Sequence, residues 1–258
     1  MRAVLCDADG NLFPSEEPAF VASADVTNAF LEAYGVSRRY TAEELRLSST
    51  GKNFRTTSVD LAAVHGVALE SSLAAGHPDA VTEGPALLTA EALERWVRQE
   101  RSQVTRYLGS VLRPDASVLG PLTRLAESYR LAAVSSSALG RLAACFTATG
   151  LDVLIPPSVR YSAEDSLPVP TSKPDPAVYL HACAQLGLDP AETVAVEDSV
   201  PGAQSAVAAG IPTVANVQFV PEAERAERTA QLREAGVSAV ISTWSELEQL
   251  LEPPERTA

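Results

Sequence analysis

Short apolar runs alternate with segments of helical pattern along the second half of the chain. The runs lie at residues 131–134, 153–155, 193–196, 212–215 and 239–241, and residues 2–6 form a further run near the N-terminus. Four of the helical segments end in glycine, the residue favoured directly after a helix, namely Gly150, Gly187, Gly210 and Gly236. This alternation predicts βαβ units and therefore a parallel sheet with helices on both faces.

Residues 15–114 follow a different pattern, because they are helical in character and show no run typical of a strand. Thr41 and Glu44 have the spacing of a capping box, which begins a short helix. The segment 90–108 has apolar residues at helical intervals. We therefore predict an α/β fold, in which a Rossmann-like parallel-sheet core of residues 1–14 and 115–258 carries an inserted α-helical cap domain at residues 15–114.

Composition narrows the range of partners. The formal net charge of −13 argues against nucleic acid and membranes, because both attract clustered positive charge. The three cysteines lack the spacing of a zinc site or a disulfide framework. The sequence shows no leader pattern and no apolar stretch long enough to span a membrane, so we expect a cytoplasmic protein.

Lysine is rare in this chain. Only Lys52 and Lys173 occur among 20 basic residues, and all the others are arginine. Arginine is a broad planar fork, whereas lysine is a compact charge on a thin stem. Both lysines are therefore candidates for positions that arginine cannot fill.

Polar side chains follow the predicted strands at the points where the strands end. Asp7 and Asp9 follow the first strand, Ser135 and Ser136 the second, Lys173 lies in the loop after the third, and Glu197 and Asp198 follow the fourth. Because the carboxyl ends of parallel strands meet at one edge of a sheet, we expect these side chains to lie close together.

Each of these residue types suits phosphoryl transfer. One carboxylate can attack phosphorus while a second moves protons, and a divalent cation such as Mg²⁺ relieves the repulsion between carboxylate and phosphate. Serine hydroxyls and the N–H groups that begin the following helix can bind phosphate oxygens, and lysine can neutralise developing charge. Every motif alone also occurs in ordinary turns and helix caps, so the argument depends on all four falling at strand ends.

The motifs resemble those of the haloacid dehalogenase-like (HAD) superfamily, in the branch with a helical cap between the first and second motifs. The similarity extends over nearly the whole chain and is most specific in the first and fourth motifs. The matching segments are residues 4–12, 133–135, 172–176, 196–202 and 208–210.

The resemblance implies a role for each motif residue. Asp7 would become the aspartyl-phosphate, and Asp9 would be the general acid and base. Phosphate-binding residues would be Ser135, Ser136 and Lys173. The ligands of Mg²⁺ would be Asp7, Asp9 through its carbonyl group, and Asp198, with Glu197 either a further ligand or a residue that contacts the ligands.

Two features depart from the family pattern. Asn11 stands where the family more often has threonine or valine, and we expect this to change local hydrogen bonding rather than the mechanism. The loop at residues 156–172 is long and contains four prolines, so it could contact the cap or a partner chain. Neither departure affects an acidic residue of the motifs.

Asp9 favours phosphate esters as substrates, because relatives that dehalogenate or cleave carbon–phosphorus bonds lack this second aspartate. We expect a Mg²⁺-dependent phosphatase of small phosphate monoesters, in the group of β-phosphoglucomutases, phosphoglycolate phosphatases and sugar phosphatases. A phosphomutase remains an alternative, since it forms the same phospho-aspartate. A non-catalytic binding protein on the same scaffold is a further alternative, which the complete motif set disfavours.

The cap is where specificity is expected to lie. Residues 51–55 resemble a segment that contacts substrate in sugar-phosphate relatives, and Lys52 and Arg55 could share one helical face. A solvated helix face is the alternative interpretation of this pair. We expect a small phosphorylated metabolite, favouring a sugar phosphate, as the partner of a monomer or weak dimer.

Overall fold

The computed structural model describes residues 1–49 and 53–251. The chain divides into two compact units. One, the core unit, is formed by Met1–Ser15 with Leu112–Ala258, and the other, the inserted unit, by Glu16–Val111.

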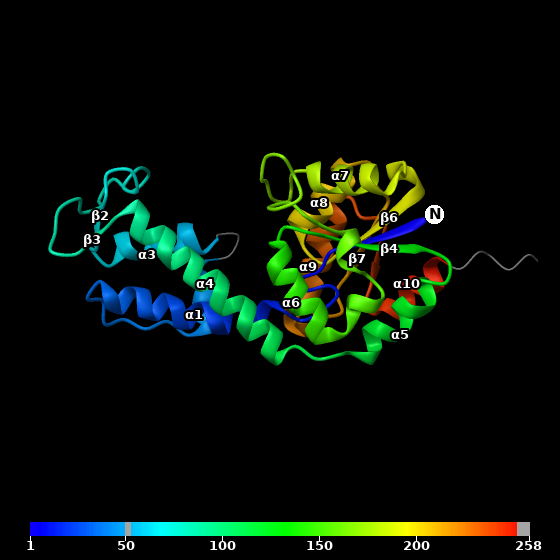
Figure 1. Cartoon of the computed structure of the whole chain (residues 1–258), viewed down its shortest axis with the longest axis horizontal. Coiled ribbons are helices and arrows are strands. Elements are labelled where there is room, and N and C mark those ends of the chain that lie inside the picture. Colours follow the sequence, from blue (N-terminus) through cyan, green and yellow to red (C-terminus); the bar gives the residue numbers. More distant parts are fainter. Residues whose placement is uncertain (50–52, 252–258) are drawn as a thin grey trace, which may run out of the picture. The chain divides into compact units, whose positions relative to one another are not determined.

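The core unit is built on a parallel sheet of six strands in the order β5-β4-β1-β6-β7-β8 (Figure 1). The strands are β1 (Ala3–Cys6), β4 (Arg130–Ser135), β5 (Arg160–Ser162), β6 (Thr193–Glu197), β7 (Thr213–Asn216) and β8 (Ala239–Ile241). The first strand is central and pairs with β4 on one side and β6 on the other. The predicted fold class, an α/β parallel sheet of Rossmann-like type, is confirmed.

Helices cover both faces of this sheet. They are α5 (Ala116–Leu125), α6 (Leu139–Thr149), α7 (Ala177–Leu186), α8 (Val200–Ala208), α9 (Glu222–Glu234) and α10 (Trp244–Leu251). Buried side chains of α7 and α8 pack with Ala3 and Leu5 of β1 and Val134 of β4 in one apolar core. Figure 1 shows α5 and α10 together on the other side of the sheet.

The third predicted strand is wrong. The apolar run 153–155 does not pair, because Leu151–Val153 forms a turn of 3₁₀ helix. The strand at this place is β5, which lies inside the segment expected to be a long loop. Arg160 of this strand is buried, and its charge is satisfied by the carbonyl of Ile155 and by an ion pair with Asp152. Because a charged residue takes a buried position, the strand lacks an apolar pattern.

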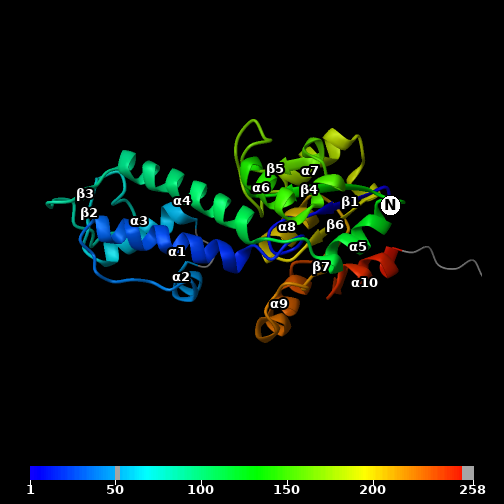
Figure 2. The same ribbon diagram turned by 60° about the horizontal axis from the view of Figure 1, so that its bottom comes forward.

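The inserted unit contains α1 (Glu16–Ala33), α2 (Ala42–Ser48), α3 (Phe54–Val64) and α4 (Ala90–Val111). Figure 2 shows α1 and α4 side by side, and Phe30 of α1 packs edge-on against Trp96 of α4. The capping box of Thr41 and Glu44 is present at the start of α2. Contrary to the expectation of no strand, Ala68–Leu69 (β2) and Leu87–Leu88 (β3) form one short parallel pair.

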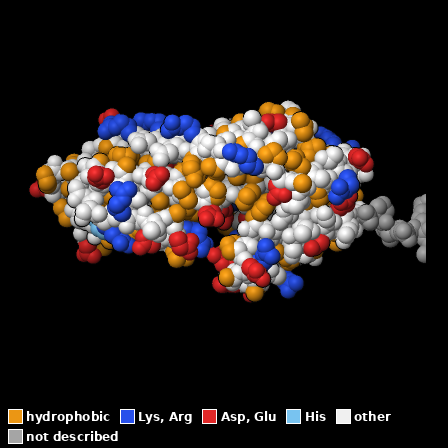
Figure 3. Space-filling view, turned by 90° about the horizontal axis from the view of Figure 1, so that it is seen from below, with side chains coloured by type: hydrophobic (Ala, Val, Ile, Leu, Met, Phe, Trp, Pro, Cys, Tyr) orange, Lys and Arg blue, Asp and Glu red, His pale blue; other side chains and the backbone are white. Residues whose placement is uncertain are grey.

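The exposed side of α4 is basic. The exposed arginines of this helix are Arg95, Arg98, Arg101 and Arg106. In the upper left of Figure 3, a row of blue Lys and Arg side chains is visible on the surface. Within the described part of the chain, no helix combines the length and apolar character needed to cross a membrane.

Candidate active site

The first motif turns sharply at the carboxyl end of β1. Asp7 follows the last residue of the strand, and its N–H donates to the carbonyl of Val196 on β6 (2.9 Å). Gly10 has φ +76°, and a Cβ atom there would overlap the carboxylate of Asp198. Glycine is therefore required both by the left-handed backbone and by the close approach of a second acid. The turn thus brings the first and fourth motifs into contact.

Lys173 joins two acids of the site. Its ammonium donates to Asp7 Oδ1 (2.5 Å), to Glu197 Oε1 (2.6 Å) and to the main-chain carbonyl of Val134 (2.8 Å). Its side chain is only 5% exposed. All three protons of the ammonium are used, so the lysine has one fixed position. Two carboxylates and one cation are thereby held together, and of the three only the Asp7 side chain reaches 10% exposure.

Sequence reasoning missed Tyr179, which lies in the first turn of α7. Its hydroxyl donates to Glu197 Oε1 (2.5 Å), and its ring centroid lies 5.2 Å from the ammonium of Lys173. The side chain is fully buried. Its one sequence signal was a tyrosine hydroxyl in an otherwise apolar helix segment, which needs a buried partner.

Burial and charge act in opposite directions on Asp7. Burial raises the pKa of its carboxyl, Lys173 lowers it, and the acids Glu197 and Asp9 raise it again, so that the pKa is raised to about 8. For Lys173, burial lowers the pKa, but the neighbouring acids Asp7 and Glu197 outweigh it and hold the pKa above its ordinary range. Further positive charge beside Asp7 would favour its ionised form.

Asp9 lies in a different environment. Its Oδ1 accepts from the Ser15 hydroxyl (2.6 Å) and from Arg141 (3.0 Å), and its Oδ2 accepts from the Ser137 hydroxyl (2.7 Å). Burial raises the pKa of this carboxyl, but Arg141 and the hydrogen bonds outweigh burial, so the pKa is lowered. The pKa values of Asp7 and Asp9 are therefore shifted in opposite directions.

The predicted phosphate-binding serines lie at the carboxyl end of β4. Ser135 is buried, and its hydroxyl accepts from the N–H of Ser137 (3.0 Å). The Ser136 hydroxyl accepts from the N–H of Lys173 (3.2 Å). All the candidate site residues of the core unit therefore come from one edge of the sheet.

Three acids form a cluster suited to a cation. Asp7, Glu197 and Asp198 are buried and offer oxygen atoms that lie within 4.8 Å of one another. Glu197 Oε1 is taken by Lys173 and Tyr179, whereas its Oε2 is buried and has no hydrogen-bond partner among the described residues. An oxygen-only donor set of net negative charge fits Mg²⁺, which prefers hard oxygen ligands.

Gly202 gives a direct test of this packing. A Cβ atom at Gly202 would overlap the buried carboxylate of Glu197. We expect Gly202→Ala to lower the free energy of unfolding by about 1–3 kcal/mol, the usual cost of overpacking, and to lower activity by displacing Glu197. The measurement is chemical denaturation, together with an assay at a temperature where the variant is folded.

The matched control is Gly140→Ala. Gly140 lies in α6, and a Cβ atom there would meet no other atom within 4 Å. Because alanine favours the helix, we expect unchanged stability or a gain of about 0.5–1 kcal/mol. Equal effects of the two substitutions would contradict the described packing of Glu197.

The predicted substrate residues belong to the inserted unit. Arg55 lies in the first turn of α3 and is ion-paired with Glu94 of α4, with a hydrogen bond of 2.9 Å from Nη2 to Oε2. Its side chain is 47% exposed. Lys52 lies outside the described residues.

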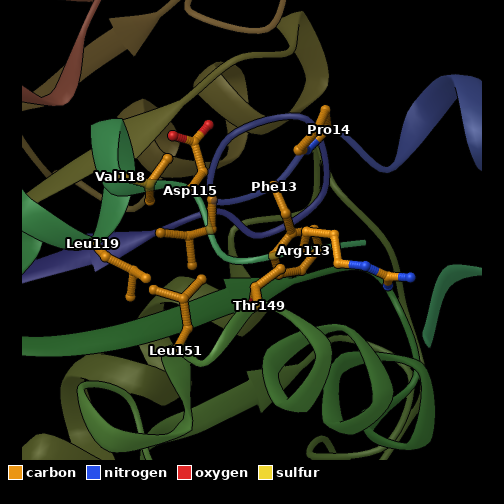
Figure 4. Close-up of a pocket in the computed structure, with 9 residues that line it drawn as sticks. Phe13, Pro14, Arg113, Asp115, Val118, Leu119, Thr149 and Leu151 are labelled. Carbon is orange, nitrogen blue, oxygen red and sulfur yellow. The ribbon is translucent and has the colours of Figure 1, made fainter. Parts of the chain in front are cut away.

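A separate small pocket lies in the core unit (Figure 4). Its walls are mostly apolar, from Leu12, Phe13, Val118, Leu119 and Leu151. None of the candidate site residues lines it.

The carboxyl edge of this sheet gathers two carboxyls with oppositely shifted pKa values, an ion-paired lysine and a cluster of three acids. Such a combination at the edge of a doubly wound sheet is typical of an enzyme. Comparison with known families agrees with this class. The haloacid dehalogenase-like hydrolase family model matches residues 1–210, and the chain belongs to this family. The predictions of the family and of an enzyme are therefore confirmed.

Solved structures with the same fold cover nearly the whole chain. A conserved haloacid dehalogenase-like protein from Agrobacterium tumefaciens is 25% identical, with a TM-score of 0.64 over 97% of both chains. A CbbY structure from Rhodobacter sphaeroides, in complex with xylulose-1,5-bisphosphate, is 21% identical, with a TM-score of 0.64 over 96% of both chains. A predicted phosphoglycolate phosphatase from Haemophilus somnus is 19% identical, with a TM-score of 0.70 over 98% of both chains.

One curated relative matches a short segment. A CBBY-like protein from Arabidopsis thaliana is 54% identical over 43 residues, which are 17% of this chain and 14% of that protein.

Proposed function

We propose that this protein is a Mg²⁺-dependent phosphatase of small phosphate monoesters, with Asp7 as the nucleophile and a sugar phosphate as the favoured substrate. The observation that carries this proposal is the contact of the Asp7 carboxylate with Lys173 at 2.5 Å, beside a second carboxyl, Asp9, which accepts three hydrogen bonds. Such a set has both an attacking group and a proton carrier.

Mg²⁺ would be held by Asp7, by the main-chain carbonyl of Asp9 and by Asp198, with Glu197 at the same cluster. When bound, it would supply positive charge that offsets the repulsion between the Asp7 carboxylate and the phosphate. Ser135, Ser136 and Lys173 would bind the phosphate oxygens.

In the first step a carboxylate oxygen of Asp7 attacks phosphorus, and the bond from phosphorus to the ester oxygen breaks. Asp9 donates a proton to the leaving oxygen, so that an alcohol is released. In the second step water attacks the phosphorus of the aspartyl-phosphate, and Asp9 takes the proton. Inorganic phosphate leaves, and the Asp7 carboxylate is restored.

The contacts of Asp9 favour its role as a base. Arg141, Ser15 and Ser137 stabilise the ionised carboxylate, which is the form that accepts a proton from water. To act as an acid in the first step, Asp9 must lose part of this stabilisation, because an ion pair with Arg141 opposes protonation. Loss of the Arg141 contact would thus accompany protonation of Asp9, which precedes the first step.

Three observations support the proposed substrate class. The CbbY structure described above contains a sugar bisphosphate, and the fold of that protein is the fold of this chain. The inserted unit also offers Arg55, a half-exposed cation, for an anionic or hydroxyl-rich substrate. The acidic net charge supports a small metabolite rather than nucleic acid as the partner. Cytoplasmic location and a monomer or weak dimer remain part of the proposal.

Phosphorus NMR on a panel of phosphate esters tests the function. With enzyme and Mg²⁺, we expect growth of the inorganic phosphate signal, and no growth after chelation of the metal. The panel includes β-glucose 1-phosphate with a trace of the bisphosphate. A new sugar phosphate signal without free phosphate would instead indicate a phosphomutase, and no metal-dependent turnover of any ester would contradict both.

Arg55 can be tested against its ion-pair partner. We expect Arg55→Ala to raise KM about tenfold with a smaller change in kcat. A tenfold change in KM corresponds to the loss of about one charge-assisted hydrogen bond to the substrate. Glu94→Ala removes the same ion pair but leaves the cation, so KM should not rise. Equal KM values for the two variants would mean that Arg55 serves only the surface pair, which is worth little.

A further inference from the structure

Asn11 lies in the turn that carries the nucleophile. Its side chain is 0% exposed. Within the turn, the main-chain N–H groups of Asn11 (3.3 Å) and Leu12 (2.9 Å) both donate to the carbonyl of Ala8, and the N–H of Gly10 donates to that of Phe13 (3.0 Å). A buried amide side chain costs free energy unless it is hydrogen-bonded, so the partners of Asn11 show what it does there.

Both amide protons of Asn11 are used beside the nucleophile. Nδ2 donates to the main-chain carbonyl of Asp7 (3.0 Å) and to the main-chain carbonyl of Val196 (3.0 Å). The same carbonyl of Val196 accepts the N–H of Asp7. The side chain thus continues the β1–β6 pairing past the point where the main chain turns away.

Residues from the far end of the chain hold Asn11 in turn. Asn216 at the end of β7 donates from Nδ2 to Asn11 Oδ1 (2.9 Å), and the indole N–H of Trp244 donates to the Asn11 carbonyl (3.2 Å). Asn216 Oδ1 accepts from the N–H of Gln218, which fixes its orientation (3.0 Å). Asn216 and Trp244 are 1% and 0% exposed.

We infer that Asn11 is a positioning residue, which with Asn216 and Trp244 forms a turn clamp that fixes the main chain of the nucleophile. Valine has no donor, and threonine has one hydroxyl proton, so neither can bond both carbonyls as asparagine does. The residue that departs from the usual family pattern therefore acts on the reacting group through the backbone. The expected effect of the turn clamp on turnover rests on the proposed function, whereas the hydrogen bonds of the clamp do not.

Graded substitutions at Asn11 measure that effect. We expect Asn11→Val to lower kcat about 10- to 100-fold with KM changed less than about threefold, because a small displacement of the nucleophile costs rate rather than substrate binding. Asn11→Thr keeps one donor and should fall between the valine variant and the unsubstituted enzyme. Asn216→Ala added to Asn11→Val should cause little further loss, because the two residues act as a unit.

The matched control is Thr213→Val. Thr213 is buried on β7, three residues before Asn216, and its hydroxyl donates to the carbonyl of Ile211 (2.8 Å). This control removes a buried hydrogen bond of the same strand but does not touch the turn. It should lower stability and leave kcat within about twofold, with all assays at a temperature where every variant is folded.

A second measurement does not depend on activity. Hydrogen exchange of the Asp7, Gly10 and Leu12 amides, followed by NMR, should become at least about tenfold faster in Asn11→Val than in Thr213→Val. If no ester is turned over by the unsubstituted protein, the proposed function fails and this exchange still decides whether the clamp exists. Equal exchange in the two variants, or a kcat of Asn11→Val equal to that of the control, would overturn the inference.

Discussion

Asp7→Asn is expected to lower turnover by about 10⁴-fold or more while the fold survives, because an amide cannot form the aspartyl-phosphate. The variant should remain stable, since Lys173 keeps its ion pair with Glu197, and burial already disfavours a charge on the side chain of Asp7. Steady-state kinetics on the best ester from the panel gives the rate, and circular dichroism shows whether the variant is folded.

The phospho-enzyme itself provides the sharper readout. Acid quench during turnover, followed by mass spectrometry, should show one added phosphoryl group on the unsubstituted protein and none on Asp7→Asn. The control is Asp189→Asn, at an exposed position where aspartate begins a 3₁₀ helix and asparagine serves equally well. Substantial activity in Asp7→Asn, with deamidation excluded by mass, would sink the nucleophile assignment.

Lys173→Met is expected to have the largest effect on stability, because it leaves the buried acids Asp7 and Glu197 without their shared cation. Removing one partner of a buried ion pair costs about 3–5 kcal/mol. Chemical denaturation measures the loss of unfolding free energy, and turnover should also be lost. A loss below about 0.5 kcal/mol would contradict the buried network.

The pH dependence of Lys173→Met follows from Asp7. Burial holds the folded pKa of this carboxyl above its ordinary value, so the folded state binds more protons than the unfolded state. The stability of the variant should therefore fall as pH rises from the unfolded pKa through the folded pKa. The double substitution Asp7→Asn with Lys173→Met should recover part of the loss, because it removes one of the two unpaired acids.

Most of the candidate site could be predicted from the sequence, because its residues follow directly after predicted strands. Asp7, Ser135 and Glu197 could be placed together from the sequence because each lies at the carboxyl end of an apolar run, and parallel strands share that edge. The same reasoning failed at β5, where a buried Arg160 breaks the apolar pattern, whereas the apolar run 153–155 begins in a 3₁₀ turn and lies outside the sheet. Strand prediction by hydrophobicity is weakest where an ion pair replaces apolar burial.

The residues that sequence reasoning missed act through contacts between distant segments. Arg141 reaches Asp9 across 132 positions, and Asn216 reaches Asn11 across 205. Such contacts depend on the rotation of a helix or the register of a strand, which hydrophobic periodicity does not fix. The roles assigned to the site residues remain predictions, whereas their proximity is a property of the fold.

All three ammonium protons of Lys173 are hydrogen-bonded, so covalent labelling of this lysine can report when the site opens. Only the unprotonated amine of a lysine attacks an amine-reactive reagent, and the Lys173 side chain is 5% exposed with a pKa held above its ordinary range by the neighbouring acids. Because the chain contains only two lysines, label on Lys173 can be read from a single peptide after digestion. Its rate of appearance would report opening of the core unit, without any engineered probe.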